Sequence, residues 1–540
     1  MTDSVSTDDG GYKPIRRQAV VVVHGQGQQR PMGTIRDFVK VLWSFNTELG
    51  PLSGDEKLNG RKTWIVPDEK SGLLELQRIT TPEHQDRRTD FFELYYADLL
   101  DDTPIRNLWR WSQRLLWIDR EDVTRRMRWS WTLFWFVNLL VLTLFVAFLL
   151  RLPDLFEESW LEPVLADQAR VPLMVIGAAL IILLLPRFSM WFAWLKVIPA
   201  WLLMFVMAGG VTAIYWSTEA DASLQVQVAL DVFLDLPAFL LLLVLAIVGY
   251  FISNVILPLF GDAASYLSAQ TETVRSREAV RRRGLALLRA LHDDSKYDRI
   301  VVVAHSLGTV LAYDLLNLLW REVGPTKDNP PSPQALVALE AVDEHTAEMG
   351  DTLPWPPDEI AKHQERQWAA FDALRQTAAE AGKDGKPPAT GGWKVSDFVS
   401  LGSPLASAQF LVTEGRADFE RMKKERVLPT APADPYEPGE LSVHEADGKK
   451  CLHHGAVFSA VRWTNLWDKF QPALVVFGDV ISGPVSPQFG PAIRDIKVRI
   501  QRRFWLPRFF THNYYWVDSD DPADPAEHVK LLREAVGMYH

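Results

Sequence analysis

The chain has 540 residues, of which 48% are hydrophobic and 21 are tryptophan, and its formal net charge is −11. This acidic balance argues against nucleic acid as the main partner. Cys451 is the single cysteine, which excludes an intrachain disulfide and favours a reducing compartment.

The first element predicted along the chain is a buried strand over residues 18–23, and a glycine-bearing loop, His24-Gly25-Gln26-Gly27, follows it. A dinucleotide-binding loop is a weak interpretation, because Arg30 stands where the third glycine of that fingerprint belongs. A second strand is expected over residues 90–96.

Four apolar runs follow, at residues 129–150, 171–185, 197–216 and 237–260. A span takes roughly 20 apolar residues, so three of the runs are long enough to cross a membrane and the second is short. The second run is therefore either the partner of a tilted neighbour or a re-entrant segment. The alternative for all four, buried core helices, fits poorly with so many runs close together. We expect an all-α transmembrane insertion of about four helices.

The charged flanks of these runs predict the orientation. Arginine-rich segments precede the first run and follow the last, whereas the loop at 151–170 is mainly acidic. By the positive-inside rule, both long polar regions are cytoplasmic, which requires an even number of crossings. The arginine triplet at 281–283 suits anionic lipid headgroups or, equally, a solvated helix face.

The next elements are a helix over residues 272–292 and a buried strand that is β-branched from Ile300 to Val303. A helical apolar pattern begins soon afterwards, and between strand and helix stands Ala304-His305-Ser306-Leu307-Gly308. A serine with small residues two positions before and after it, in this context, is the nucleophile-elbow arrangement. The alternative is a serine that caps a core helix.

Residues 322–396 form an additional segment before the next strand. Its ends, at 324–333 and 382–392, are rich in proline, glycine and polar residues and are predicted loops. Residues 359–381 between them have the pattern of an exposed amphipathic helix. That helix is either a cap or lid over the site or a surface decoration.

Later strands are expected over residues 397–401 and 460–467, and a final segment, 509–517, includes His512. Strands that alternate with helices imply a parallel sheet covered by helices on both faces. Neither polar region holds enough strands alone. We therefore expect one α/β domain, built from residues 1–128 and 261–540 and interrupted by the transmembrane insertion at 129–260.

A serine hydroxyl becomes a nucleophile when a histidine, oriented by a carboxylate, takes its proton. Of the 12 histidines, His512 is the best placed, because it comes late in the chain after the last strand candidate. The acid should lie just beyond the strand at 460–467, where Asp468 is the first candidate and Asp479 the alternative. A third interpretation makes Asp468 a surface residue beside Lys469.

Backbone N–H groups should stabilise the developing negative charge on a substrate. One is expected from Leu307 and another from the loop after the first strand, at Gln26 or its neighbour Gly25. Neither a phosphate loop nor a His-Glu-x-x-His metal motif is present in the sequence, so neither a cofactor nor a metal is expected.

Four segments together, residues 21–27, 304–308, 401–405 and 512–516, resemble a serine α/β-hydrolase of the lipase/esterase superfamily, particularly its bacterial membrane-embedded members. The resemblance implies an α/β-hydrolase-type, mostly parallel sheet and cleavage of an acyl ester through an acyl-enzyme at Ser306. The implied partners are the lipid bilayer and an acyl-ester substrate, most simply a lipid. Nothing in the sequence sets the oligomeric state.

The resemblance also implies an integral protein of the bacterial inner (plasma) membrane, with the hydrolase domain and both termini cytoplasmic. Relatives often carry the acid in an Asp-Pro step after the penultimate strand, where this chain has Gln471-Pro472. That difference keeps a second function open: a membrane-anchored scaffold or signalling protein that retains the hydrolase fold with little or no turnover.

Overall fold

The computed structural model describes most of the two polar regions. The described residues are 15–25, 30–52, 54–73, 75–100, 266, 271–327, 329–350, 353–381, 392–413, 415–435, 440–469, 471–472, 476–479, 481–500, 511–518 and 525–538. The four apolar runs predicted to span a membrane lie outside these ranges. Within these ranges, the structure contains no helix with the length and apolar character that a membrane crossing requires.

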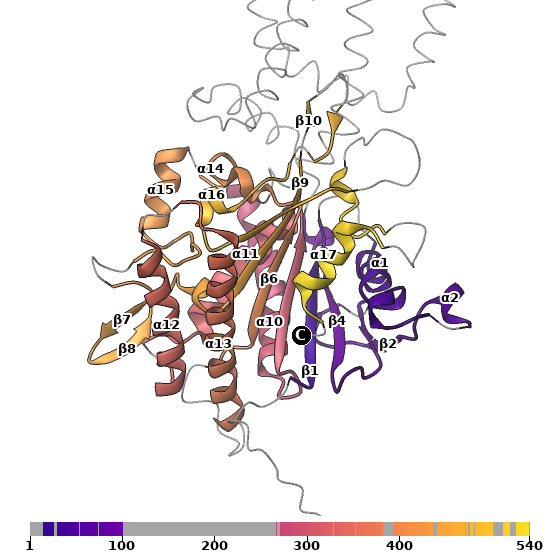
Figure 1. Cartoon of the computed structure of the whole chain (residues 1–540), viewed down its shortest axis with the longest axis horizontal. Coiled ribbons are helices and arrows are strands. Elements are labelled where there is room, and N and C mark those ends of the chain that lie inside the picture. Colours follow the sequence, from indigo (N-terminus) through magenta and orange to yellow (C-terminus); the bar gives the residue numbers. More distant parts are fainter. Residues whose placement is uncertain are drawn as a thin grey trace, which may run out of the picture. The chain divides into compact units, whose positions relative to one another are not determined.

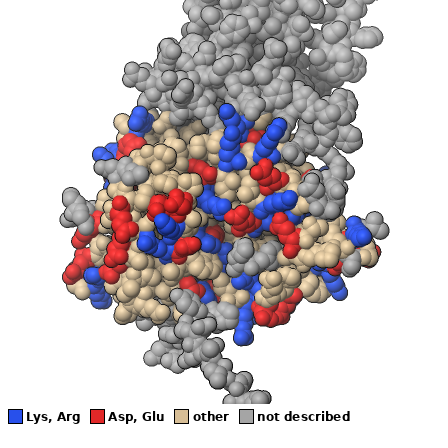
Figure 2. All heavy atoms as spheres, in the orientation of Figure 1, with Lys and Arg blue, Asp and Glu red and all other residues tan. Residues whose placement is uncertain are grey.

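The chain divides into two compact units, residues 1–101 with 269–540, and residues 102–268. All elements named below belong to the first, called here the α/β unit. Basic and acidic side chains are interspersed on the face of this unit that Figure 2 shows.

One mixed sheet organises the described part of the α/β unit, with the strand order β12-β9-β6-β5-β1-β4-β3-β2 (Figure 1). Neighbours from β12 to β4 pair in parallel, and β3 and β2 extend the sheet as antiparallel strands. The bounds are β1 (Arg17–Val23), β2 (Trp64–Pro67), β3 (Gln77–Thr80), β4 (Arg88–Leu94), β5 (Arg299–His305), β6 (Val395–Leu401), β9 (Arg462–Asp468) and β12 (Arg494–Val498).

The predicted α/β class is confirmed, and a single sheet joins strands from both polar regions, because β1 pairs with both β4 and β5. The strands expected near 18–23, 90–96, 300–303, 397–401 and 460–467 are β1, β4, β5, β6 and β9. The final segment follows the last strand, as expected for His512. Its described residues, 511–517, hold no strand, and His512 lies instead in a 3-10 turn, η10 (Thr511–Asn513).

Helices cover both faces of this sheet, as expected for parallel strands that are buried on both sides. All seven residues of β5 are buried. One face packs on α1 (Gly33–Val39) and α17 (Glu527–Val536), where Val20, Val301 and Val303 share a core with Phe38 and Leu532. The helices α10 (Thr271–Asp293) and α11 (Leu307–Val323) lie behind the sheet in the view of Figure 1.

The helix predicted at 359–381 is α13 (Pro357–Ala381), and it pairs with α12 (Pro333–Met349). Its Trp368 ring lies under two guanidinium groups, 5.1 Å from Arg299 Cζ and 4.5 Å from Arg462 Cζ. These arginines begin β5 and β9, at the opposite end of the strands from Ser306. With Phe371 fully buried, α13 is a core helix on the sheet, and neither a surface decoration nor a cover over the site.

Shorter elements connect these. They are a π-helix, η1 (Lys40–Ser44); the helices α2 (Glu56–Asn59), α14 (Ala408–Leu411), α15 (Arg416–Lys424) and α16 (Ser486–Phe489); the 3-10 turns η2 (Thr47–Leu49), η3 (Ala97–Leu99), η8 (Pro404–Ser407) and η9 (Val457–Ser459); and two hairpins, β7 (Val443–Ala446) with β8 (Lys449–Leu452), and β10 (Gln471–Pro472) with β11 (Val476–Phe477).

Candidate active site

Ser306 occupies the sharp turn between β5 and α11, with φ 52° and ψ −129°. A positive φ at a residue other than glycine costs of order 1–3 kcal/mol. The turn is held by the Ser306 N–H, which donates to the Leu401 carbonyl at 3.0 Å. Gly308 is required by a close approach, because a Cβ there would lie 2.3 Å from the carbonyl oxygen of His24. The strand–turn–helix context expected around Ser306 is present.

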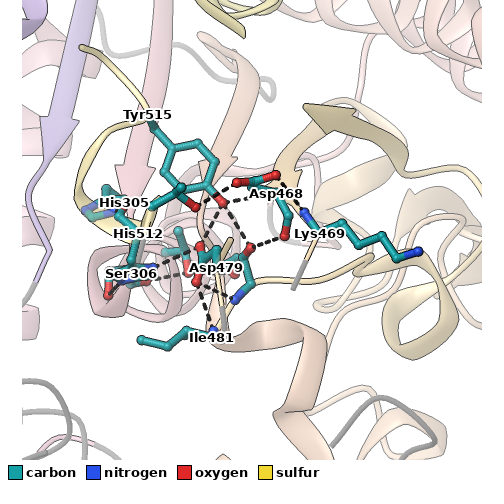
Figure 3. Close-up of polar contacts among 12 residues, drawn as sticks. His305, Ser306, Asp468, Lys469, Asp479, Ile481, His512 and Tyr515 are labelled. Atoms are coloured by element: carbon teal, nitrogen blue, oxygen red, sulfur yellow. Dashed lines mark hydrogen bonds and ion pairs between the residues drawn. The ribbon is translucent and has the colours of Figure 1, made fainter. Parts of the chain in front are cut away.

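His512 connects the serine to a carboxylate (Figure 3). Its Nε2 lies 2.7 Å from Ser306 Oγ, and its Nδ1 lies 3.0 Å from Asp479 Oδ2. An ionised carboxylate only accepts hydrogen bonds, so the Nδ1 atom carries the proton and Nε2 is left to accept from the serine hydroxyl. All three side chains are buried. In this geometry an imidazole can take the proton of a serine hydroxyl as it attacks.

Both carboxylate oxygens of Asp479 accept hydrogen bonds. Its Oδ1 accepts from the backbone N–H groups of Ile481 at 2.9 Å and Ser482 at 3.2 Å. Its Oδ2 accepts from His512 and from the Tyr515 hydroxyl, at 3.0 and 2.8 Å. Burial by itself raises the pKa of this carboxyl, but the charge interaction with His512 and these hydrogen bonds outweigh it, so the pKa lies below its ordinary value. Asp479 is therefore ionised beside the imidazole.

Asp468, the acid favoured from the sequence, does not lie against His512. Its Oδ2 accepts the Thr511 hydroxyl at 2.7 Å, and its Oδ1 accepts the Lys469 N–H at 2.8 Å. The geometry therefore corrects the order of the two candidates and brings Asp479 to the histidine. The physical reason is that Asp468 ends β9 and holds the residue before His512, while β10 and β11 carry the chain onward. Asp468 is also buried, which excludes the surface-residue interpretation.

Two further residues at the site, Gly402 and Tyr515, lie in segments that carry the resemblance, but the sequence assigns a role to neither. Gly402, directly after β6, has φ 59°, and a Cβ there would lie 2.8 Å from Tyr515 Cε2 and 3.2 Å from the His512 ring. The backbone of Gly402 therefore packs closely against the His512 ring. The available signals were a glycine directly after a predicted parallel strand and the presence of Tyr515 in the segment 512–516.

Of the expected oxyanion groups, Leu307 and Gly25 lie next to Ser306. Leu307 is the first residue of α11, and its N–H belongs to the first turn, where a helix provides no internal acceptor. A Cβ on Gly25 would lie 3.0 Å from the Ser306 Cβ and 2.6 Å from His305 Nδ1, so the backbone at Gly25 approaches the serine closely. Gln26 lies outside the described residues.

Two other histidines near the serine are held neutral. His24 stacks on Tyr96, accepts its backbone N–H at Nε2 and lies 2.7 Å from the Gly25 carbonyl through Nδ1. The Nε2 of His305 lies 2.7 Å from the His512 carbonyl. Burial lowers the pKa of His24 to about 4 and that of His305 to about 3. Both rings thus support the backbone around the site rather than compete with His512 as bases.

Within the described ranges, no group of three or more His, Cys, Asp or Glu side chains is arranged to hold a metal ion. Comparison with protein-family models, with curated proteins and with solved structures gave no match. An activated serine, a base and an ionised acid in hydrogen-bonded sequence form the arrangement that acyl transfer uses.

Proposed function

We propose that this protein is a serine hydrolase that cleaves an acyl ester through an acyl-enzyme at Ser306. In this mechanism His512 takes the hydroxyl proton as Ser306 attacks the carbonyl, and then donates it to the departing alcohol. Water then attacks the acyl-enzyme carbonyl and gives a proton to His512, which returns it to Ser306 Oγ as the bond to the acyl group breaks and the acid is released. Asp479 keeps the proton on Nδ1 throughout, and the N–H groups of Leu307 and the Gly25–Gln26 loop stabilise the oxyanion.

The observation that carries the proposal is the unbroken series of hydrogen bonds Ser306–His512–Asp479, with the serine at a positive φ between a strand and a helix. A buried serine that merely caps a helix needs neither the strained backbone nor a histidine on its hydroxyl. The presence of Asp479 also weakens the argument for an inactive scaffold, which rested on the residue pair Gln471-Pro472.

We also propose that the unit is an α/β-hydrolase-type domain, interrupted by a transmembrane insertion of about four helices at residues 129–260. The chain leaves the sheet after β4, whose Leu94 is in register with Val23, and so at the carboxyl edge that carries Ser306. After the insertion, α10 packs against the segment that follows β4, because Arg283 donates to Asp98 at 2.6 Å and to the Tyr95 carbonyl at 3.1 Å.

This connectivity supports a lipid or another membrane-partitioned acyl ester as the substrate, since β4, the last described strand before the insertion, ends at the edge of the sheet that holds the serine. The flanking charges support an inner-membrane location with the hydrolase domain in the cytoplasm. The arginines at 281–283 pair with carboxylates of Asp314, Glu278 and Asp98. We therefore do not assign them to lipid headgroups.

A fluorophosphonate probe tests the proposal without knowledge of the substrate. We expect the full-length protein to be labelled covalently, and Ser306→Ala to abolish labelling. Ser403→Ala is the matched control, because Ser403 is a buried serine at the same sheet edge that hydrogen-bonds to Thr309 rather than to a histidine. Absence of labelling in folded wild-type protein would favour the scaffold function, and a labelled Ser306→Ala variant would contradict the assigned nucleophile.

A further inference from the structure

Tyr515 is a buried polar group at the site that the proposed mechanism does not use. Its ring packs beneath Gly402, and 1% of the residue is exposed. Its hydroxyl lies 2.8 Å from Asp479 Oδ2 and 2.9 Å from Ser482 Oγ, and it accepts the Asp468 N–H at 3.1 Å. The hydroxyl therefore sits between the two candidate acids (Figure 3).

The hydroxyl of Tyr515 has one proton to donate, and its direction follows from its neighbours. Ser482 can donate its own hydroxyl proton and so needs no proton from the tyrosine, whereas the ionised Asp479 can only accept. Burial raises the pKa of the Tyr515 phenol well above its ordinary value, and the Asp479 charge raises it further. The phenol thus stays protonated, and its proton is directed to Asp479 Oδ2.

The same oxygen accepts the Nδ1 proton of His512, so the phenol and the imidazole share one acceptor. A second donor on Asp479 Oδ2 reduces the negative charge that this oxygen offers to its hydrogen bond with the imidazole. It also fixes the rotation of the carboxylate, because the two backbone N–H groups hold only the other oxygen. A ring that served only to fill space under Gly402 would not require the hydroxyl.

We propose that Tyr515 is a positioning residue whose hydroxyl orients Asp479 toward His512 and moderates how strongly that carboxylate holds the imidazolium form. This inference rests on the proposed function and deepens it. Asp468 joins the same network, since its backbone donates to the Tyr515 hydroxyl and its carboxylate holds Thr511, the residue before His512.

The groups that face the imidazole from each packed element, among the described residues, are few. Asp479 comes from the loop after β11, and Ser306 from the turn after β5. His305 comes from β5, with its ring centroid 4.8 Å from that of His512. Burial lowers the pKa of His305 to about 3, so this ring stays neutral near neutral pH. A change at the imidazole on removal of the Tyr515 hydroxyl is therefore not caused by a charge on His305.

The test compares Tyr515→Phe, which keeps the ring and removes the hydroxyl, with wild type in the full-length protein. The first readout is the titration of the low-field proton NMR signal of the His512 Nδ1–H group, identified by its loss in Asp479→Asn. The second is the pH dependence of fluorophosphonate labelling, whose acid limb follows the protonation of the base. Tyr313→Phe is the matched control, since the Tyr313 hydroxyl is buried and donates to the Pro429 carbonyl.

We expect Tyr515→Phe to move both the His512 titration and the acid limb upward by about one pH unit, because a carboxylate without the phenol donor stabilises the imidazolium more strongly. Tyr313→Phe should leave both in place. A Tyr515→Phe titration that coincides with wild type would overturn the inference while labelling at Ser306 still upheld the hydrolase. Conversely, a shifted NMR titration in a protein that never reacts with the probe would uphold the role of Tyr515 and refute the proposed function.

Discussion

The replacement of Asp479 by asparagine should damage the site far more than the same change at Asp468. In Asp479→Asn, the amide oxygen stays with the two backbone N–H groups at Ile481 and Ser482, which can only donate. The amide nitrogen then faces His512 and donates to Nδ1, so the proton moves to Nε2. An Nε2–H group cannot accept the proton of Ser306. A wrong tautomer of this kind lowers turnover by about 10⁴-fold.

Asp468→Asn provides the matched comparison. Its amide oxygen can remain on the Lys469 N–H, and the Thr511 hydroxyl can rotate to accept from the new amide nitrogen. Both hydrogen bonds become neutral, a change of about 1 kcal/mol each. Neither bond involves His512, so we expect turnover to fall far less than in Asp479→Asn. Rates of fluorophosphonate labelling and ester hydrolysis, measured at one pH on full-length proteins with matching thermal unfolding, separate the two variants. Equal losses in both variants, or a larger loss in Asp468→Asn, would refute the assignment of Asp479.

Two further predictions concern the backbone around the serine and a buried carboxyl. Gly25→Ala places a Cβ 2.6 Å from His305 Nδ1 and 3.0 Å from the Ser306 Cβ, so we expect labelling to be lost and stability to fall by about 1–3 kcal/mol. Gly33→Ala, with nothing nearer than 4.0 Å, should leave labelling unchanged, and equal labelling of both variants would argue against the close approach. Glu93 accepts the Met32 N–H at 2.6 Å, yet burial raises its pKa from 4.5 to about 7. Between these values the folded protein holds a proton that the unfolded chain has lost, so this group makes stability fall as the pH rises through that window. In wild type the free energy of unfolding should fall between pH 5 and pH 8, and in Glu93→Gln this fall should be smaller by about 2–3 kcal/mol. Denaturant titrations at the two pH values measure it. An equal fall in both proteins would contradict the buried, proton-holding state of Glu93.

The sequence predicts those parts of the fold that depend on local pattern. The buried β-branched run before Ser306 and the helical pattern after it determine the elbow within one short stretch. The strand β12 escaped prediction because it lies at the sheet edge and only Val498 among its residues is buried. The sequence pattern of α13 predicts an exposed amphipathic helix, because the helix buries polar side chains, such as the paired Asp372 and Arg375, as well as apolar ones.

The choice between the two acids could not be made from the sequence for a related reason. Asp468 and Asp479 both follow β9, and spacing alone does not tell which side chain turns toward His512. That direction depends on the β10–β11 hairpin and on long-range contacts, namely Thr511 with Asp468 and Tyr515 with Asp479. Such contacts join segments more than 30 residues apart and leave no periodic signal.

The central claim is that Ser306 is a nucleophile activated by His512. Peptide mapping of the fluorophosphonate adduct on the full-length protein tests it most directly. We predict that Ser306 is the single modified residue. Over the time in which the wild-type protein is labelled, neither His512→Ala nor Asp479→Asn should be modified. An adduct on another serine, or equally fast modification of Ser306 without His512, would contradict it.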